Sequence, residues 1–224
     1  MIDVFLVDDQ DLFRSGIGVI IDAQSDMRVV GQAAGGLDAV RLVDQLCPMV
    51  VLMDVRMPEM DGVEATRQIF STERIGRRSQ PVRVIVLTTF DLDHRAATAI
   101  RYGASGFLLK DVSPARLLEA IRTVHAGNAV LAPQDLTALL DAHFKEPTPV
   151  PAEYDDLTRK EHEVFTGITQ GKSNGEIATE IFVSESTVKT HVGSILRKLG
   201  LRDRVQIIVF AHEHRLMGVS RGDG

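Results

Sequence analysis

The first 130 residues alternate between short apolar, β-branched runs and longer amphipathic segments. The apolar runs predict strands over residues 4–7, 28–33, 50–53, 83–87 and 106–108. The amphipathic segments predict helices over residues 12–21, 37–46, 63–72, 94–102 and 115–125. Strands that alternate with helices in this way indicate a parallel sheet with helices on both faces. The pattern therefore predicts an α/β domain with the order (βα)5 over residues 1–130.

The strand pattern stops after this domain. Residues 134–156 lose their periodicity and contain three prolines among acidic residues, which favours an extended, semi-rigid segment. We expect residues 131–156 to be a linker. From residue 157 the pattern is helical only, with capping boxes at Thr158 and Ser173, a third cap at Ser184 and a fourth helix near Asp203. We expect a four-helix, all-α domain over residues 157–215.

Composition places the chain among ordinary globular proteins, with 44% hydrophobic and 25% charged residues. No run approaches the ~20 apolar residues of a membrane span, and the N-terminus has no basic leader, so we expect a cytoplasmic protein without a membrane partner. The net charge is −6, but residues 157–215 carry 9 basic against 7 acidic side chains. Binding to nucleic acid is therefore expected only in the C-terminal part.

Acidic residues follow two of the expected strands. Asp8 and Asp9 end the first strand and Asp54 ends the third. The carboxyl ends of parallel strands border the crevice where ligands bind, so these carboxylates should converge. Crowded carboxylates need a counter-charge, and a small all-oxygen site suits Mg²⁺.

The same edge should also receive Thr88, after the fourth strand, and Lys110, after the fifth. A hydroxyl, an ammonium and a metal site are the parts that neutralise a transferred phosphoryl group. Taken singly, each residue is more often a turn or surface residue. Their joint placement favours a phosphoacceptor site.

The segment 173–199 predicts two helices across a tight turn. Val188, Val192, Ile195 and Leu199 recur at helical spacing and should bury one side of the second helix. The DNA-contacting candidates on this helix are Thr187, Lys189, Thr190, His191, Arg197 and Lys198. Thr187 and Lys198 are expected at phosphates, and His191 at the backbone or in the core. An ordinary helical bundle with a solvated polar face fits the amphipathic pattern equally well.

The N-terminal motifs closely resemble the receiver domain of two-component response regulators. They are Val7-Asp8-Asp9, Met53 through Gly62, Thr88, and Gly103 through Lys110. The resemblance implies a flavodoxin-like fold in which Asp54 takes a phosphoryl group from a sensor histidine kinase. It implies that Asp8, Asp9, Asp54 and the carbonyl of Arg56 hold Mg²⁺, that Thr88 and Lys110 bind phosphoryl oxygens, and that Phe107 acts as a switch residue. Phe107 replaces a common tyrosine, and Asp111 replaces a common proline whose peptide bond is often cis.

The C-terminal motifs resemble the LuxR-type helix-turn-helix of the NarL/FixJ class. They span residues 157–164, 171–178 and 186–192. The resemblance implies sequence-specific binding of double-stranded DNA, with Lys189 and Thr190 facing bases, and control of transcription through a homodimer formed on phosphorylation. Gly193 and Gly175 depart from the usual polar residues, so one contact to bases can be missing.

Two other functions remain open at this point. One is an orphan regulator whose receiver domain serves only to form a dimer. The complete set of expected phosphoacceptor-site residues argues against it. The other is a phosphoaspartate hydrolase, but such enzymes commonly carry an acid/base Asp where this chain has Arg56. We expect no enzyme activity beyond removal of the chain's own phosphoryl group.

Overall fold

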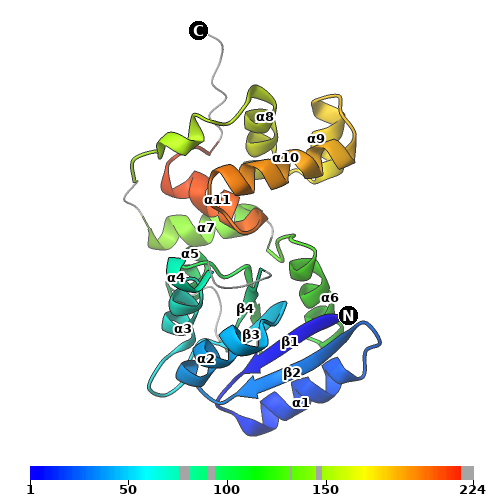
Figure 1. Cartoon of the computed structure of the whole chain (residues 1–224), viewed down its shortest axis with the longest axis vertical. Coiled ribbons are helices and arrows are strands. Elements are labelled where there is room, and N and C mark those ends of the chain that lie inside the picture. The colour runs from blue at the N-terminus through cyan, green and yellow to red at the C-terminus, as the bar shows by residue number, and fades with distance from the viewer. Residues whose placement is uncertain (76–80, 90–93, 132, 145–147, 218–224) are drawn as a thin grey trace. The chain divides into compact units, whose positions relative to one another are not determined.

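The computed structural model describes residues 1–75, 81–89, 94–131, 133–144 and 148–217. The chain divides into two compact units, Met1–Val130 and Leu131–Gly224. Figure 1 shows that the strands belong to the first unit and that the second is built of helices. Within the described ranges, no helix has the length and apolar character needed to cross a membrane.

The first unit is built on one parallel sheet. Its strands are β1 (Ile2–Val7), β2 (Met27–Ala33), β3 (Val50–Asp54), β4 (Arg83–Thr88) and β5 (Gly106–Leu109). Their spatial order is β2-β1-β3-β4-β5, and each pair is parallel. Every residue of β3 is buried, as expected for a central strand covered on both faces. The expected (βα)5 sheet is confirmed.

Among the described residues of this unit, six segments are helical. They are α1 (Asp11–Asp22), α2 (Gly36–Leu46), α3 (Gly62–Ile69), α4 (Thr72–Ile75), α5 (His94–Arg101) and α6 (Pro114–His125). One core cluster joins alternate strand residues, among them Leu6, Leu52 and Leu87, to Ile21 of α1 and Ile121 of α6. The period of two in the strands thus places α1 and α6 over one face of the sheet. The short helix α4 was not expected.

The expectation of an extended linker over residues 131–156 is wrong for its first half. Residues Pro133–His143 form helix α7, which contacts α11 (Arg204–Glu213). Leu136, Leu139 and Leu140 are buried at helical spacing. A 3-10 turn, η1 (Ala152–Tyr154), follows, and its Tyr154 ring packs edge-on against Phe165 at 5.2 Å. Apolar spacing before the prolines was enough to form a helix that packs within the second unit.

The remaining helices of the second unit begin at the predicted caps. They are α8 (Arg159–Thr169), α9 (Asn174–Glu180), α10 (Glu185–Lys198) and α11. Thr158 and Ser173 form complete capping boxes, and Ser184 and Asp203 accept hydrogen bonds from the first turns of α10 and α11. Helix α11 contacts α7, α8 and α10. Because α11 has helices on several sides, its residues 205–211 are all buried.

Candidate functional site

Three carboxylates meet at one edge of the parallel sheet. Asp8 and Asp9 follow β1, and Asp54 ends β3, which pairs directly with β1. One carboxylate oxygen from each residue lies within 4.8 Å of the other two. Asp8 and Asp54 are 3% and 4% exposed, whereas Asp9 is exposed. The predicted convergence of these side chains is present, and their hard oxygen donors match the ligands that Mg²⁺ prefers.

Lys110 brings the positive charge to this edge. Its Nζ lies 2.7 Å from Oδ2 of Asp8 and 3.0 Å from Oδ2 of Asp54. The same ammonium lies 4.9 Å from the centre of the Phe13 ring. The backbone directs Lys110 there, because its N–H donates to the carbonyl of Thr88 at 2.7 Å and so extends the β4–β5 pairing by one residue. One ammonium is thereby shared between two buried carboxylates.

Burial controls the electrostatics of this cluster. Burial raises the pKa of Asp54, and the charge of Asp8 adds to the effect, while the ion pair with Lys110 opposes it. Burial alone would lower the pKa of Lys110, but Asp8 and Asp54 outweigh it, and the pKa lies above its usual value. Lys110 is therefore held charged, whereas ionised Asp54 lacks full compensation. The site can accept further positive charge.

Thr88 and the turn after β3 complete the site. Thr88 is 2% exposed at the end of β4, beside the residue that pairs with Asp54. The backbone N–H of Arg56 donates to Oδ1 of Asp54 at 3.3 Å, while the Arg56 residue is exposed. Gly62 begins α3 against the carbonyl of Asp54, where a β-carbon would lie 2.0 Å from that oxygen. Only glycine allows the helix to start this close to Asp54.

The two residues that depart from the receiver pattern have ordinary structural positions. Phe107 is 8% exposed in β5 and pairs with Val86 of β4, so its ring belongs to the buried part of the sheet. Its switch role remains a prediction. The peptide bond between Lys110 and Asp111 is trans, as are the others in the described chain.

On helix α10, three of the DNA-contacting candidates are exposed. Lys189 pairs with Glu185 at 3.2 Å on the surface, and the hydroxyl of Thr190 donates to the Ser186 carbonyl at 3.1 Å. Arg197 is also exposed and donates to the nearby Ser194 hydroxyl at 3.2 Å. Surface pairs of this kind cost little to break. These three side chains are free to exchange their local partners for a ligand.

The other three candidates are less accessible. Thr187 and His191 are half-buried, and the Thr187 hydroxyl lies 2.8 Å from the Ser184 hydroxyl in the helix cap. Lys198 bonds the carbonyl of Asp156 at 2.8 Å and the carboxylate of Glu161 at 2.7 Å. The structure thus separates Lys198 from the exposed group. Its role at a DNA phosphate stays a prediction.

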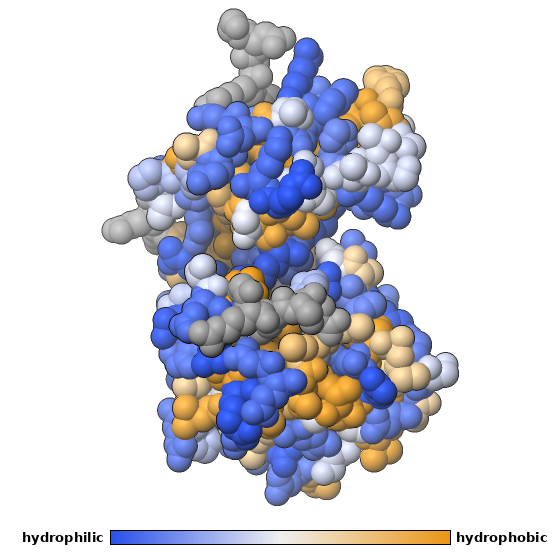
Figure 2. Space-filling view, in the orientation of Figure 1, coloured by the Kyte–Doolittle hydropathy of each residue, from blue (hydrophilic) through white to orange (hydrophobic). Residues whose placement is uncertain are grey.

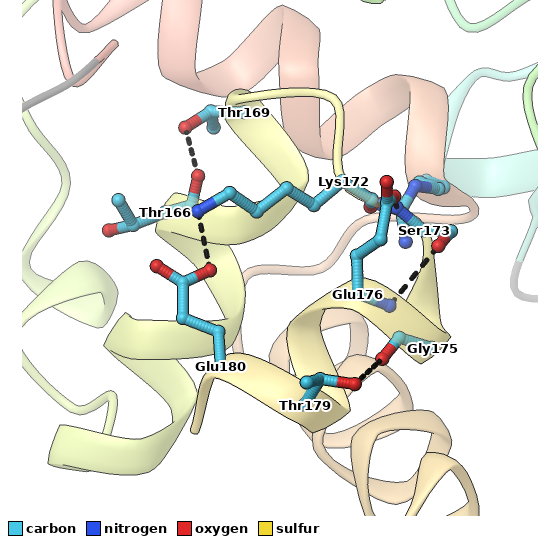
Figure 3. A network of polar contacts seen from close by, with 9 residues as sticks. Thr166, Thr169, Lys172, Ser173, Gly175, Glu176, Thr179 and Glu180 are labelled. Carbon is cyan, nitrogen blue, oxygen red and sulfur yellow. Dashed lines mark hydrogen bonds and ion pairs between the residues drawn. The ribbon is translucent and has the colours of Figure 1, made fainter. Parts of the chain in front are cut away.

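Polar contacts also fix helix α9, which precedes α10 in the helix-turn-helix. Figure 3 shows Lys172 paired with Glu180, and the N–H of Glu176 donating to the Ser173 hydroxyl at 3.2 Å. Arg204 of α11 donates to the carbonyl of Lys172 and to the Asn174 side chain. Burial lowers the pKa of Arg204. Sequence patterns did not single out Arg204, because nothing at its position in the chain indicates that it folds back onto α9.

The surface of the second unit that is visible in Figure 2 is mainly hydrophilic, with hydrophobic residues in small groups. The contacts and exposure described above give two candidate sites: the acidic edge of the first unit and the exposed polar side of α10 in the second. Each lies in the unit where the sequence predicted it.

Comparison with known proteins identifies the family to which each unit is similar. Residues 4–122 match the family model of the response regulator receiver domain, and residues 155–211 match the bacterial regulatory proteins of the luxR family. Transcriptional regulatory protein YxjL of Bacillus subtilis is 41% identical over 212 residues, covering 94% of each chain. Transcriptional regulatory protein LiaR of the same organism is 37% identical, covering 97% of this chain and 100% of that protein.

A solved LuxR-family response regulator from Aurantimonas sp. has the same fold, with a TM-score of 0.54 at 31% identity. The match covers 63% of this chain and 96% of that one. The relatives align along nearly the whole chain, and the two family models match its two units separately. The chain therefore belongs to the two-component response regulators that join a receiver domain to a LuxR-type helix-turn-helix domain.

Proposed function

We propose that transfer of a phosphoryl group to Asp54 controls the binding of double-stranded DNA by helix α10. The observation that carries the proposal is the edge of the sheet where the buried Asp54 lies with Asp8, Asp9, Thr88 and Lys110. This edge combines a nucleophilic carboxylate, a hydroxyl and a fixed ammonium. Such an arrangement favours phosphoryl transfer, in which the protein mainly positions the reacting groups and stabilises charge.

The donor is the phosphohistidine of a sensor histidine kinase. A carboxylate oxygen of Asp54 attacks the phosphorus, the P–O bond forms as the P–N bond breaks, and the released imidazole takes a proton from solvent. The Lys110 ammonium, already charged and 3.0 Å from Asp54, stabilises a phosphoryl oxygen. The Thr88 hydroxyl donates to another. The residues lie on four different strands or strand ends, so the rigid sheet supplies the alignment.

Mg²⁺ is the cation that fits the negative charge and the oxygen ligands of this site. Asp8, Asp9 and Asp54 would hold it with the Arg56 carbonyl, and it would supply positive charge against the phosphoryl oxygens. The donor set supports this assignment because it is made of oxygen ligands only. Two buried carboxylates that share one ammonium also leave negative charge to be offset.

Phosphorylation is proposed to act through Thr88 and Phe107. Movement of Thr88 toward the new phosphoryl group would let Phe107 repack and change the surface formed by α5 and α6, which then forms a homodimer. A phosphoryl group can shift such an equilibrium only by binding the two states differently. The dimer would present two α10 helices to paired DNA sites and regulate transcription in the cytoplasm.

Labelling with a small phosphodonor tests the acceptor assignment. Wild type, Asp54→Asn and Asp38→Asn are incubated with radiolabelled acetyl phosphate and Mg²⁺. Asp38 is a matched control because it lies on the surface of α2 in an ion pair with Arg41. We expect label on wild type and Asp38→Asn and none on Asp54→Asn. Full labelling of Asp54→Asn would refute the assignment.

Selection of bound duplexes from a random DNA pool, with and without phosphodonor, tests the coupling to DNA. Enrichment that increases with phosphodonor supports phosphate control. Equal enrichment with and without it would indicate an orphan regulator. Turnover of external phosphate esters would instead support a hydrolase, and the exposed side chain of Arg56 beside Asp54 offers no acid or base for that reaction.

A further inference from the structure

Lys198 faces away from the exposed polar side of α10. An α-helix turns by about 100° per residue, so Lys198, nine positions after Lys189, lies about half a turn from it. Arg197, seven positions after Thr190, lies within about 20° of that residue. Lys198 also follows the buried Ile195 by three positions, which places it on the packed side. Helix geometry thus separates two adjacent cationic residues, Arg197 and Lys198.

The partner of Lys198 is a buried carboxylate on α8. Glu161 is 4% exposed, and its Oε2 accepts from Lys198 Nζ at 2.7 Å and from the Thr158 N–H at 2.7 Å. Ser194, one turn before Lys198 on α10, also hydrogen-bonds this carboxylate. A single side chain of α8 therefore holds two consecutive turns of α10. Lys198 gains a second anchor at the Asp156 carbonyl, 2.8 Å away.

These contacts hold the Glu161 carboxylate in its ionised form. Burial opposes ionisation of Glu161, but hydrogen bonds from Lys198, Ser194 and Thr158 outweigh it and lower its pKa to about 2. Only 27% of the Lys198 side chain is exposed, against 65% for Lys189. Moving Lys198 to a phosphate would leave a charged, buried carboxylate without its cation, which is unfavourable.

We propose that Lys198 and Glu161 are positioning residues that orient α10 against α8, and that Lys198 does not bind a DNA phosphate. The proposal rests on the proposed function in one respect, that α10 is the helix that contacts DNA. It replaces the phosphate role expected for Lys198 from the sequence. DNA affinity would then depend on Lys198 through the orientation of Lys189, Thr190 and Arg197.

A rescue experiment distinguishes positioning from phosphate contact. The full-length variants are Lys198→Met, Glu161→Gln, the double variant and Arg197→Met as a neighbouring control. Binding is measured at several salt concentrations on a duplex recovered from a random pool with wild type, and thermal unfolding is followed for each protein. Glutamine keeps a carbonyl oxygen for the Thr158 cap while removing the charge that needs Lys198.

We expect Lys198→Met to weaken binding roughly ten-fold, because the unpaired carboxylate of Glu161 displaces α10. Adding Glu161→Gln should restore most of the affinity and raise the thermal midpoint above that of Lys198→Met. Arg197→Met should lower the slope of log affinity against log salt by about 1 and leave the midpoint unchanged. Lys198→Arg, which can still reach Glu161, should bind like wild type.

The opposite pattern would overturn the proposal. A double variant that binds as weakly as Lys198→Met, with a salt slope lowered by about 1, would place Lys198 at a phosphate. Failure of wild type to bind any duplex would instead contradict the proposed function. The thermal midpoints would then still decide the positioning role, because additive effects of the two substitutions contradict it and coupled effects support it.

Discussion

Replacement of Gly62 by alanine should disrupt the proposed acceptor site through a steric clash with the backbone of Asp54. The new β-carbon would lie 2.0 Å from the carbonyl oxygen of Asp54, 2.9 Å from its carbonyl carbon and 3.0 Å from Cγ of Met53. Since β-carbon contacts below 3.0 Å essentially do not occur, the backbone must shift by at least 1.0 Å. The Gly62 N–H also donates to Val55 at 3.0 Å, so the start of α3 cannot move without losing that bond.

Overpacking of this kind typically costs about 1–3 kcal/mol, and a clash between a β-carbon and a backbone oxygen should lie at the upper end because no rotamer can relieve it. Gly16 provides a matched control in the same unit, since it lies inside α1 with nothing within 4 Å of an added β-carbon. Gly16→Ala should therefore stabilise the receiver by about 0.5–1 kcal/mol. The two substitutions add the same methyl group with opposite effects.

Urea unfolding followed by circular dichroism measures both changes, and labelling with acetyl phosphate reports on the position of Asp54. Gly62→Ala should lower the unfolding midpoint and the labelling rate, while Gly16→Ala should raise the midpoint and label normally. A Gly62→Ala protein with wild-type stability and a wild-type labelling rate would refute the close approach of α3 to β3.

Three further predictions concern charge and helix propensity. Asp54→Asn should raise the thermal midpoint at neutral pH, because burial raises the Asp54 pKa and the ionised carboxylate therefore lowers the stability of the wild type. The gain should fade in acid, where the wild-type carboxyl is protonated, and a lower midpoint at neutral pH would contradict this. Glu161→Gln should lower the free energy of unfolding by its full amount above pH 4.5, and this loss should shrink as the pH falls toward about 2. Urea unfolding across this pH range measures the loss, and a loss that does not change with pH would count against the ion pair. Gly193→Ala should stabilise α10 by up to ~1 kcal/mol, because the added β-carbon would meet open space. If the side of α10 that carries Gly193 faces DNA, the added methyl group should also weaken binding to the selected duplex. Unchanged affinity would place Gly193 away from the interface.

The acidic edge could be predicted from the sequence because parallel-sheet geometry leaves little choice. Because Asp8 directly follows its strand and Asp54 and Thr88 end theirs, these residues must lie at the same edge once the sheet is parallel. The side chain of Lys110 was harder to place, since a residue after a strand can point to solvent. Its shared pairing with two carboxylates depends on distances that no sequence pattern provides.

The second unit shows where pattern reasoning fails. Helix α7 was missed because the prolines after it dominated the interpretation of the whole segment, although Leu136, Leu139 and Leu140 already had helical spacing. Helical periodicity identifies a buried side of α10 but not which neighbouring helix covers it, so the contact of Lys198 with α8 could not be predicted. Glu161 belongs to the capping box that the sequence predicts at Thr158, and its second partner lies 37 residues away.

Two buried carboxylates in this chain meet a lysine with opposite electrostatic results. Glu161 receives Lys198 together with two further donors, and its pKa falls to about 2. Asp54 shares Lys110 with Asp8, and its pKa rises. A fully compensated carboxylate gains little from an added cation, so Glu161 is suited to hold helices together. An under-compensated carboxylate is unfavourable until positive charge arrives, which gives a metal ion a favourable free energy of binding beside it. The incomplete pairing of Asp54 is thus the physical property that favours the proposed metal site at this edge.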